Sequence, residues 1–343
     1  MILIMFKSMN NLLFMFMLIF SVVCIFSSNS WISCWFYLEM NLLSIIPIIN
    51  MVKNLYSSES SLKYFLIQVF ASINLLFIIL LFFYLNYWNN FLMLNNNNMM
   101  MMMNLILMMK MGIPPFHYWM MQIIESMIWM NCFIILVWQK IAPLVMMSYY
   151  MNKILLFIII IFSLFISSIM SLNQLSFRKL MIYSSINHLM WMISSLYINE
   201  LLWMFYFLLY FILIYMLFYL FNMFNYFNMN QFFFLKFNFK IKFYIFLNLL
   251  SMIGLPPMLG FMSKLILVQF FMINMMYMLM FNLIMFNLII IFMYLRILYI
   301  LFYMNILNMK FYMYLSNNNL FVMKMFSYLN LYYLMFIYLI FMI

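Results

Sequence analysis

Residues 110–119 read KMGIPPFHYW and residues 254–264 read GLPPMLGFMSK, and these two stretches decide how the chain can fold. All three glycines of the 343-residue chain lie in them, as do four of its six prolines. Proline removes a backbone donor and interrupts a helix, and glycine accepts the distorted backbone. The sequence therefore predicts two helix breaks, made by Gly112, Pro114 and Pro115 and by Gly254, Pro256 and Pro257.

The composition predicts an integral membrane protein. The chain is 71% hydrophobic and only 6% charged, whereas roughly a quarter of the residues in a soluble domain are charged. The net charge is +11, but the basic residues form no patch on a soluble fold. We therefore expect no nucleic-acid partner. The three cysteines form no metal-ligand cluster, so we expect no metal or iron–sulfur site in this chain.

Long apolar segments predict an all-α polytopic fold. About 20 apolar residues cross a bilayer, and this window gives about eleven spans. We expect no cleavable signal peptide, because the first span leads directly into more membrane sequence. The predicted spans are 9–26, 31–49, 62–84, 99–121, 126–147, 153–172, 179–198, 201–224, 241–272, 276–302 and 325–343.

The basic residues between the spans predict the orientation of the chain. With eleven spans, Lys153 alone lies on one side of the membrane, and ten basic residues lie on the side of the N-terminus. Positively charged loops stay on the cytoplasmic or matrix side, so we expect the N-terminus there and the C-terminus opposite. The ten are Lys7, Lys53, Lys63, Arg178, Lys179, Lys236, Lys240, Lys242, Lys310 and Lys324.

The two breaks predict internal symmetry. They fall five spans apart, in 99–121 and 241–272, so their spans run in opposite directions. Transporters built from inverted repeats place broken helices at corresponding positions, where they line a cavity. We therefore expect two five-helix inverted repeats. Most of the first repeat lies in 31–147, the second repeat covers 153–272, and the C-terminal helices occupy 276–343.

Charged residues inside the spans are the candidate functional groups. Each costs about 2.5–3.5 kcal/mol at the centre of a membrane helix. Glu39 is the only carboxylate well inside a span, and Lys110, Lys140 and Lys264 are buried amines. Lysine can lose its proton in a low-dielectric site, which arginine cannot, so these residues suit proton transfer. The alternative is a static ion pair of Glu39 with a lysine that only fixes helix packing.

Polar side chains near the breaks predict a hydrated path. His117 follows the first break, and Ser184, Ser185, His188 and Ser195 recur at helical spacing in span 179–198. Histidine titrates near neutrality, and a serine hydroxyl both donates and accepts hydrogen bonds. Such a stripe can hold water and conduct protons. It can equally be an interhelical hydrogen-bond patch, and both interpretations remain open.

Six stretches of the chain carry a resemblance to one known family. They are SNSWISCWFYLEMNLLSIIPII (28–49), SSESSLKYFLIQVFAS (57–72), GIPPFHYW (112–119), WQKIAPL (138–144), LNQLSFRKLMIYSSINHLMWM (172–192) and GLPPMLGFMSK (254–264). Together they resemble the NADH dehydrogenase subunit 2 family of mitochondrial complex I in its insect form. The resemblance covers residues from about 28 to 300, in the family's order. That family is antiporter-like and similar to Mrp-type cation/proton antiporters.

The resemblance implies roles for single residues. Glu39 and Lys110 would form the glutamate–lysine pair of the first repeat, and Lys140 would bridge towards the centre. Lys264 would lie on the second broken helix, near the exit or the neighbouring subunit. His117 and His188 would belong to the connecting hydrated path. One departure is Ser263 in GFMSK, where the insect pattern has proline. The family's long members have fourteen helices and animal subunit 2 lacks three, which agrees with the eleven predicted here.

The resemblance also implies a setting. The chain would be a proton-translocating subunit in the mitochondrial inner membrane, coupled to NADH oxidation and ubiquinone reduction. Its partners would be other membrane-arm subunits, including antiporter-like neighbours, and membrane lipids. Flavin, iron–sulfur clusters and quinone would be held by other subunits. Two alternatives stay open: a free-standing Mrp-like cation/proton antiporter, and a purely structural spacer of the membrane arm.

Overall fold

The fold is helical throughout the part that the structure describes. The computed structural model describes residues 2–50, 55–88, 96–229, 231, 239–256, 258–303 and 330. Every regular element in those ranges is a helix, and one isolated antiparallel bridge joins Ser176 to Asn228. Six helices within the described residues are long and apolar enough to cross a membrane. The predicted all-α polytopic class is therefore confirmed. The predicted last span, 325–343, lies outside the described residues apart from residue 330.

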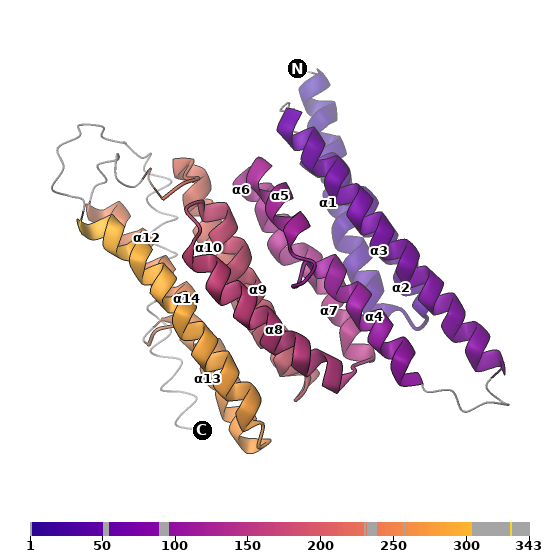
Figure 1. Cartoon of the computed structure of the whole chain (residues 1–343). Coiled ribbons are helices and arrows are strands. Elements are labelled where there is room, and N and C mark those ends of the chain that lie inside the picture. The colour runs from indigo at the N-terminus through magenta and orange to yellow at the C-terminus, as the bar shows by residue number, and fades with distance from the viewer. Residues whose placement is uncertain are drawn as a thin grey trace. The chain divides into compact units, whose positions relative to one another are not determined.

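The chain divides into two compact units, and the first is Met1–Ile159. In this unit α1 packs against α2, and α2 packs against α3 (Figure 1). Helices α3 and α7 both contact α4, the helix that ends at the first break. The helices of this unit are α1 (Ile2–Ser27), α2 (Trp31–Ile49), α3 (Leu55–Trp88), α4 (Asn96–Met111), α5 (Tyr118–Ser126), α6 (Trp129–Phe133), the π-helix η1 (Ile134–Trp138) and α7 (Gln139–Tyr149).

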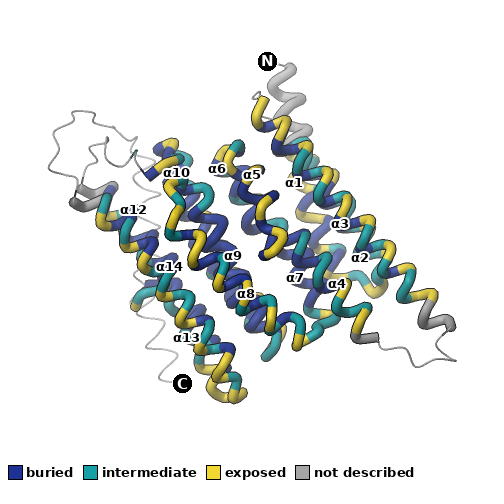
Figure 2. The backbone as a smooth tube through the Cα atoms, viewed as in Figure 1, coloured by how far each residue is buried: buried dark blue, intermediate teal, exposed yellow. Residues whose placement is uncertain are grey.

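The second unit is Ile160–Ile343, and α8 (Lys153–Leu172) crosses the boundary between the two. Here α9 contacts α10 and α14, while α13 contacts α10, α12 and α14. Helix α9 is buried from Leu180 to Leu196, as its dark blue tube shows (Figure 2). The remaining helices are α9 (Phe177–Leu196), α10 (Glu200–Phe224), α12 (Phe239–Ile253), α13 (Leu259–Ile273) and α14 (Tyr277–Tyr303).

Local capping explains where several helices begin and end. The hydroxyl oxygen of Ser30 accepts from the Ser33 amide at the start of α2, and the side-chain oxygen of Asn199 accepts from Leu201 at the start of α10. Each cap satisfies one of the amides that the first helical turn leaves without a partner. Helix α10 ends at Asn225, whose φ of 52° is left-handed, a conformation that asparagine tolerates well.

Both glycine–proline stretches interrupt a helix. Helix α4 ends before Gly112 (φ 69°), and α5 starts six residues later. Helix α12 ends before Gly254 (φ 76°), and α13 starts five residues later. Positive φ costs an ordinary residue strain that glycine avoids, so the two glycines fix where the breaks begin. Pro114, Pro115 and Pro256 lie in the turns, and Pro257 lies outside the described residues.

The π-helix is a feature that the sequence did not predict. The segment Trp129–Tyr149 is one continuous helix, but its turn at Ile134–Trp138 is wider than an α-helical turn. The following helix, α7, contains Pro143 and carries Lys140 in its first turn. Short π-helical turns inside α-helices are frequently found at functional sites. The residues that follow this turn, Lys140 among them, are therefore candidates for a functional site.

Candidate functional site

The first break places Lys110 in the last turn of α4, with its side chain buried. In an α-helix its carbonyl would accept from the amide of residue 114, but Pro114 has no N–H. The side chain of Gln68 on α3 replaces that donor, and its Nε2 lies 3.1 Å from the carbonyl oxygen of Lys110. A buried amide from a neighbouring helix thus stabilises the broken end of α4.

Glu39 on α2 is the candidate partner of Lys110. Glu39 and Lys110 form no ion pair within 4.0 Å in the part of the chain that the structure describes, although they interact electrostatically. An exposed pair on α3, Lys63 and Glu59, is in contact at 2.6 Å. The Oε1 atom of Glu39 is buried and has no hydrogen-bond partner among the described residues. The pairing of Glu39 with Lys110 therefore stays a prediction.

Lys140 lies beside a polar chain that links three helices. Its side chain is 1% exposed, and its neighbour Gln139 accepts a hydrogen bond from the Tyr64 hydroxyl at 3.0 Å. Gln139 in turn donates to the side-chain oxygen of Asn41 at 3.1 Å. The chain Tyr64–Gln139–Asn41 therefore connects α3, α7 and α2.

Two small cavities adjoin this polar chain. One is lined in part by Lys110, Gln139 and Tyr64, and the other by both Lys110 and Lys140. Each has a volume of about 10 Å³, which is close to the space of one water molecule. Lys110 and Lys140 thus line cavities that are about as large as one water molecule, and such a water could conduct a proton between groups of the first unit.

His117 lies within the first break, where it is 2% exposed. It directly precedes α5, and its ring centroid is 4.3 Å from that of Tyr118. The break therefore buries an ionisable ring close to the turn that Pro114 and Pro115 create.

The second break holds its lysine in a different way. The Nζ of Lys264 on α13 donates to the Ile253 carbonyl at 2.8 Å and to Oδ1 of Asn287 on α14 at 3.0 Å. Residue 257, four positions after Ile253, is a proline, so that carbonyl also has no helical donor. Asn187 on α9 donates to the same Asn287 oxygen at 3.2 Å. Lys264 is thus bound by neutral oxygens from the break and from α14.

The predicted polar stripe on α9 contacts tyrosines of other helices. Ser184 and Ser185 donate to carbonyls of their own helix, at 3.0 and 2.7 Å. His188 on the same stripe makes a contact between helices, since its Nδ1 lies 2.8 Å from the hydroxyl oxygen of Tyr206 on α10. This contact fits both interpretations of the stripe, because hydroxyl and imidazole groups can join helices and can also transfer protons.

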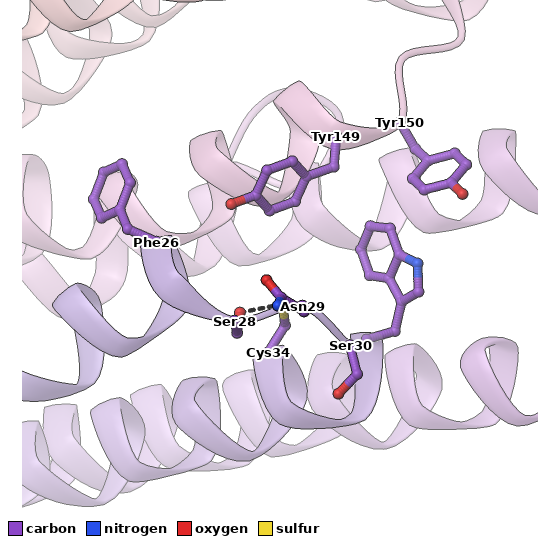
Figure 3. A pocket seen from close by; sticks show the side chains of 8 residues that line it. Phe26, Ser28, Asn29, Ser30, Cys34, Tyr149 and Tyr150 are labelled. Carbon is purple, nitrogen blue, oxygen red and sulfur yellow. Dashed lines mark hydrogen bonds between the residues drawn. The ribbon is translucent and has the colours of Figure 1, made fainter.

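A third pocket is larger than these two cavities, and none of the lysines discussed above lines it. It has a volume of about 340 Å³, and a 2.9 Å contact between Ser28 Oγ and Cys34 Sγ lies at its wall (Figure 3). None of its lining residues is a carboxylate, a lysine or a histidine, so it differs from the lysine sites described above. The lining consists of Phe26, Ser28, Asn29, Ser30, Trp31, Cys34, Tyr149 and Tyr150.

Sequence reasoning missed the neutral residues of the site. Gln68, Gln139 and Asn287 hold or connect the lysines, yet none was predicted. Asparagine is frequent everywhere in this chain, so a single Asn in a span carries little signal. The two glutamines had a usable signal, since uncharged polar residues inside apolar spans commonly bond between helices. Among the described residues, no group of three His, Cys, Asp or Glu side chains could hold a metal ion.

Comparison with known proteins supplies an independent line of evidence. A family model described as NADH:quinone oxidoreductase/Mrp antiporter, transmembrane, matches residues 28–291. The NADH-ubiquinone oxidoreductase chain 2 of Aedes aegypti is 49% identical over 265 residues, and that of Anopheles gambiae 42% over the same length. Each alignment covers 77% of this chain and 77% of the relative.

Solved structures agree on the fold. A chain of respiratory complex I from Thermus thermophilus superposes with a TM-score of 0.79 at 16% identity, over 95% of this chain and 78% of that one. A chain of the Mrp complex from Dietzia superposes with a TM-score of 0.71 at 13% identity, over 84% and 60%. At these identities the likeness concerns the fold alone.

Proposed function

Since the chain belongs to the NADH:quinone oxidoreductase/Mrp antiporter family, and to its NADH-ubiquinone oxidoreductase chain 2 branch, we propose that it translocates protons as a membrane-arm subunit of respiratory complex I. It would do so in the mitochondrial inner membrane, coupled to NADH oxidation and ubiquinone reduction. Other membrane-arm subunits, among them antiporter-like ones, and membrane lipids would surround it.

One observation carries the proposal: each helix break has a buried lysine beside it. Lys110 and Lys264 are each 7% exposed, in a chain with only 6% charged residues. Burying an amine in a membrane protein is costly, and such residues generally mark ion or proton pathways. Broken helices are tolerated in the membrane where they line a cavity, which supports the same interpretation.

The proposed mechanism assigns a role to each charged group. Glu39 would hold Lys110 in its charged form when the two approach and would favour release of the proton when they separate. Lys140 would exchange protons with the same region through the small cavities of the first unit. Lys264 would serve the second unit, near the exit or the neighbouring subunit. His117, His188, Ser184 and Ser185 would belong to the hydrated connections.

The proposal includes an architecture and an orientation for the whole chain. The chain would cross the membrane about eleven times and would contain two five-helix inverted repeats. Most of the first repeat would lie in 31–147, the second would cover 153–272, and C-terminal helices would follow in 276–343. The N-terminus would face the matrix, and the C-terminus the intermembrane space. Flavin, iron–sulfur clusters and quinone would be held by other subunits, and this chain would bind no metal.

A native gel tests the assignment to the complex. Inner membranes are solubilised gently, separated, probed for this chain and stained for NADH oxidation. We expect the chain to migrate only with the large NADH-oxidising band. Migration alone or in a small oligomer without that activity would contradict the proposal and favour a free-standing cation/proton antiporter.

Proton counting tests the role of the charged pair. We expect Lys110→Met or Glu39→Gln to lower the number of protons moved per electron in fully assembled enzyme. The exposed pair on α3 offers matched controls, Lys63→Met and Glu59→Gln, which we expect to leave the ratio unchanged because water screens that pair. A normal ratio in the assembled Lys110→Met and Glu39→Gln enzymes would favour the structural-spacer alternative.

A further inference from the structure

Four aromatic rings line the pocket of about 340 Å³ in the first unit, and we call them the aromatic wall. Phe26 lies in the last turn of α1, Trp31 begins α2, and Tyr149 ends α7 with Tyr150 directly after it. The ring centroid of Trp31 lies 5.1 Å from that of Tyr150 and 6.4 Å from that of Tyr149, and the planes of the second pair are 81° apart. In Figure 3 the three labelled rings lie along one side of the pocket, and the loop that carries Asn29 lies along the other.

The surrounding helices hold these rings in place. The ring of Tyr150 also packs edge-on against Phe82 on α3, at 6.4 Å between centroids. The buried side chain of Asn104 on α4, with its amide oriented to suit both neighbours, donates to the Tyr150 carbonyl at 2.9 Å and accepts from the Asn152 amide at 3.0 Å. The N-cap of α2 fixes the turn that begins with Trp31. A ligand would therefore meet a wall that is already formed, which reduces the entropy lost on binding.

The pocket lies where a membrane protein meets the lipid headgroups. Helices α1 and α7 end at it, and α2 begins there. Four of the spans expected from the sequence separate residues 28–30 from residues 150–152, an even number, so both loops belong to one face of the membrane. The structure brings these two loops together at the pocket. Tryptophan and tyrosine are enriched at this depth, where one end of the ring is apolar and the other is wet.

The chemistry of the lining selects a cation that needs no counter-charge. The pocket has no charged side chain, but the faces of aromatic rings are electron-rich and attract a quaternary ammonium group within about 6 Å. A primary ammonium is hydrated more strongly and would lose water without gaining a carboxylate. Asn29 is exposed and has no hydrogen-bond partner among the described residues, so its amide can donate to a phosphate oxygen. Lys153, also exposed, begins α8 three positions after Tyr150 and adds a positive charge near that loop.

We propose that this pocket binds the headgroup of a phosphatidylcholine molecule. The quaternary ammonium lies against the rings of Trp31, Tyr149 and Tyr150, and the phosphate lies towards Asn29. A volume of about 340 Å³ is within the range of small-molecule sites, roughly 300–1,000 Å³. The inference goes beyond the proposed function, because it depends on the chain crossing a membrane and not on proton transfer.

Photolabelling of the native assembly tests the choice of headgroup. The assembly that contains this chain is solubilised with trace photoreactive phosphatidylcholine, or with phosphatidylethanolamine of the same acyl chains, and is irradiated. We expect peptides with residues 28–34 and 149–150 to take up more of the choline lipid, and excess unlabelled phosphatidylcholine to displace it. Equal labelling by the two lipids, or crosslinking of these peptides to a neighbouring subunit in place of lipid, would overturn the proposal. Displacement by free choline at the same concentration would assign the pocket to a soluble ligand instead.

Substitutions at Tyr149 test the role of the rings. Tyr149→Leu removes a ring and Tyr149→Phe keeps it, so we expect the first to lower the choline-lipid labelling by about fivefold and the second to retain it. The matched control is Tyr277→Leu, which removes an exposed tyrosine at the start of α14, outside the pocket, and should leave the labelling unchanged. Unchanged labelling in Tyr149→Leu would show that the aromatic wall binds no cation. If that variant does not assemble, the displacement of the choline lipid from the unaltered protein decides.

These results are independent of the proposed function. The labelling is measured on whichever native assembly carries the chain, and no proton is counted. A chain that migrates without NADH-oxidising activity would contradict the proposed function and leave the lipid site intact. Loss of the headgroup preference in a chain that migrates with the NADH-oxidising band would contradict the lipid site alone.

Discussion

The two helix breaks solve one backbone problem in two ways. In each, the carbonyl four residues before a proline has lost its helical donor. In the first unit Gln68 donates to the carbonyl of Lys110, and the ammonium of that lysine is left to interact with Glu39. In the second unit the ammonium of Lys264 itself donates to the Ile253 carbonyl. The two lysines are therefore not equivalent: the proposed counter-group of Lys110 is a carboxylate, and the ammonium of Lys264 is bound by neutral oxygens.

The largest effect is expected from Gly260→Ala, which tests how tightly the second break is closed. A Cβ at Gly260 would collide with the carbonyl of Ser251 on α12, and a backbone atom cannot move aside as a side chain can. Overpacking of this kind costs roughly 1–3 kcal/mol or more. We expect little assembled complex on native gels and a lower dissociation temperature. Normal assembly would show that α12 and α13 can move apart to accommodate the added methyl group, so that their contact at the second break is not tight.

Asn287→Leu tests whether neutral oxygens hold Lys264. The change removes one of the two acceptors of the ammonium and the acceptor of the Asn187 amide. Each buried polar group left without a partner costs about 1–3 kcal/mol. We expect reduced thermal stability and a lower proton-to-electron ratio. Asn282→Leu on the same helix is the control, because Asn282 is only half-buried and its side chain donates to Met278 of its own helix. If both variants had the same thermal stability and the same proton-to-electron ratio, neutral oxygens would not hold Lys264 and the proposed difference between the two breaks would be wrong.

Gly254→Ala and Gly112→Ala compare the glycines directly. Both have positive φ, so each alanine costs about 1–2 kcal/mol of backbone strain. The added methyl at Gly254 would lie 3.1 Å from Nζ of Lys264, whereas at Gly112 it meets the flexible end of Met120. We expect both variants to lower the dissociation temperature and Gly254→Ala alone to change the proton-to-electron ratio by displacing the amine. The same ratio in both assembled variants would contradict this distinction.

The smallest effect is expected from Gln68→Leu. It leaves the Lys110 carbonyl without its donor but does not touch the ammonium. The loss of one neutral hydrogen bond costs about 1 kcal/mol, with an added penalty for the buried carbonyl. We expect a modest fall in dissociation temperature and an unchanged proton-to-electron ratio. A fall in the ratio as large as that of Lys110→Met would show that the backbone of α4 positions the amine.

Sequence patterns predicted the elements that depend on local chemistry. The predicted spans 31–49 and 153–172 coincide with α2 and α8, because an N-cap or a loop marks their ends. The glycine–proline stretches interrupt helices where they should, since proline and glycine act on the adjacent backbone. The buried state of Lys110, Lys140 and Lys264 could also be expected from their apolar surroundings in the sequence.

Features that depend on packing between helices could not be predicted from the sequence. The π-helix at Ile134–Trp138 contains no glycine or proline that would predict it. The donor to the Lys110 carbonyl comes from Gln68, 42 positions earlier, and no spacing rule links them. Glu39 and Lys110 were expected to pair, but whether they make contact depends on the distance between α2 and α4. Such distances are set by the packing of many side chains together.

The π-helical turn has a consequence for how this protein could vary. A π-turn closes its hydrogen bond one residue later than an α-turn, so η1 holds one residue more than a regular helix needs. Each residue rotates an α-helix by about 100° and lengthens it by about 1.5 Å. Loss of a single codon within this turn would therefore restore a regular α-turn and leave Lys140 on nearly the same face of its helix relative to the preceding segment. Loss of a codon from a regular turn between Trp129 and Lys140 would instead rotate the lysine by about 100°, so the wide turn is the place where this helix can change its length without moving the charge.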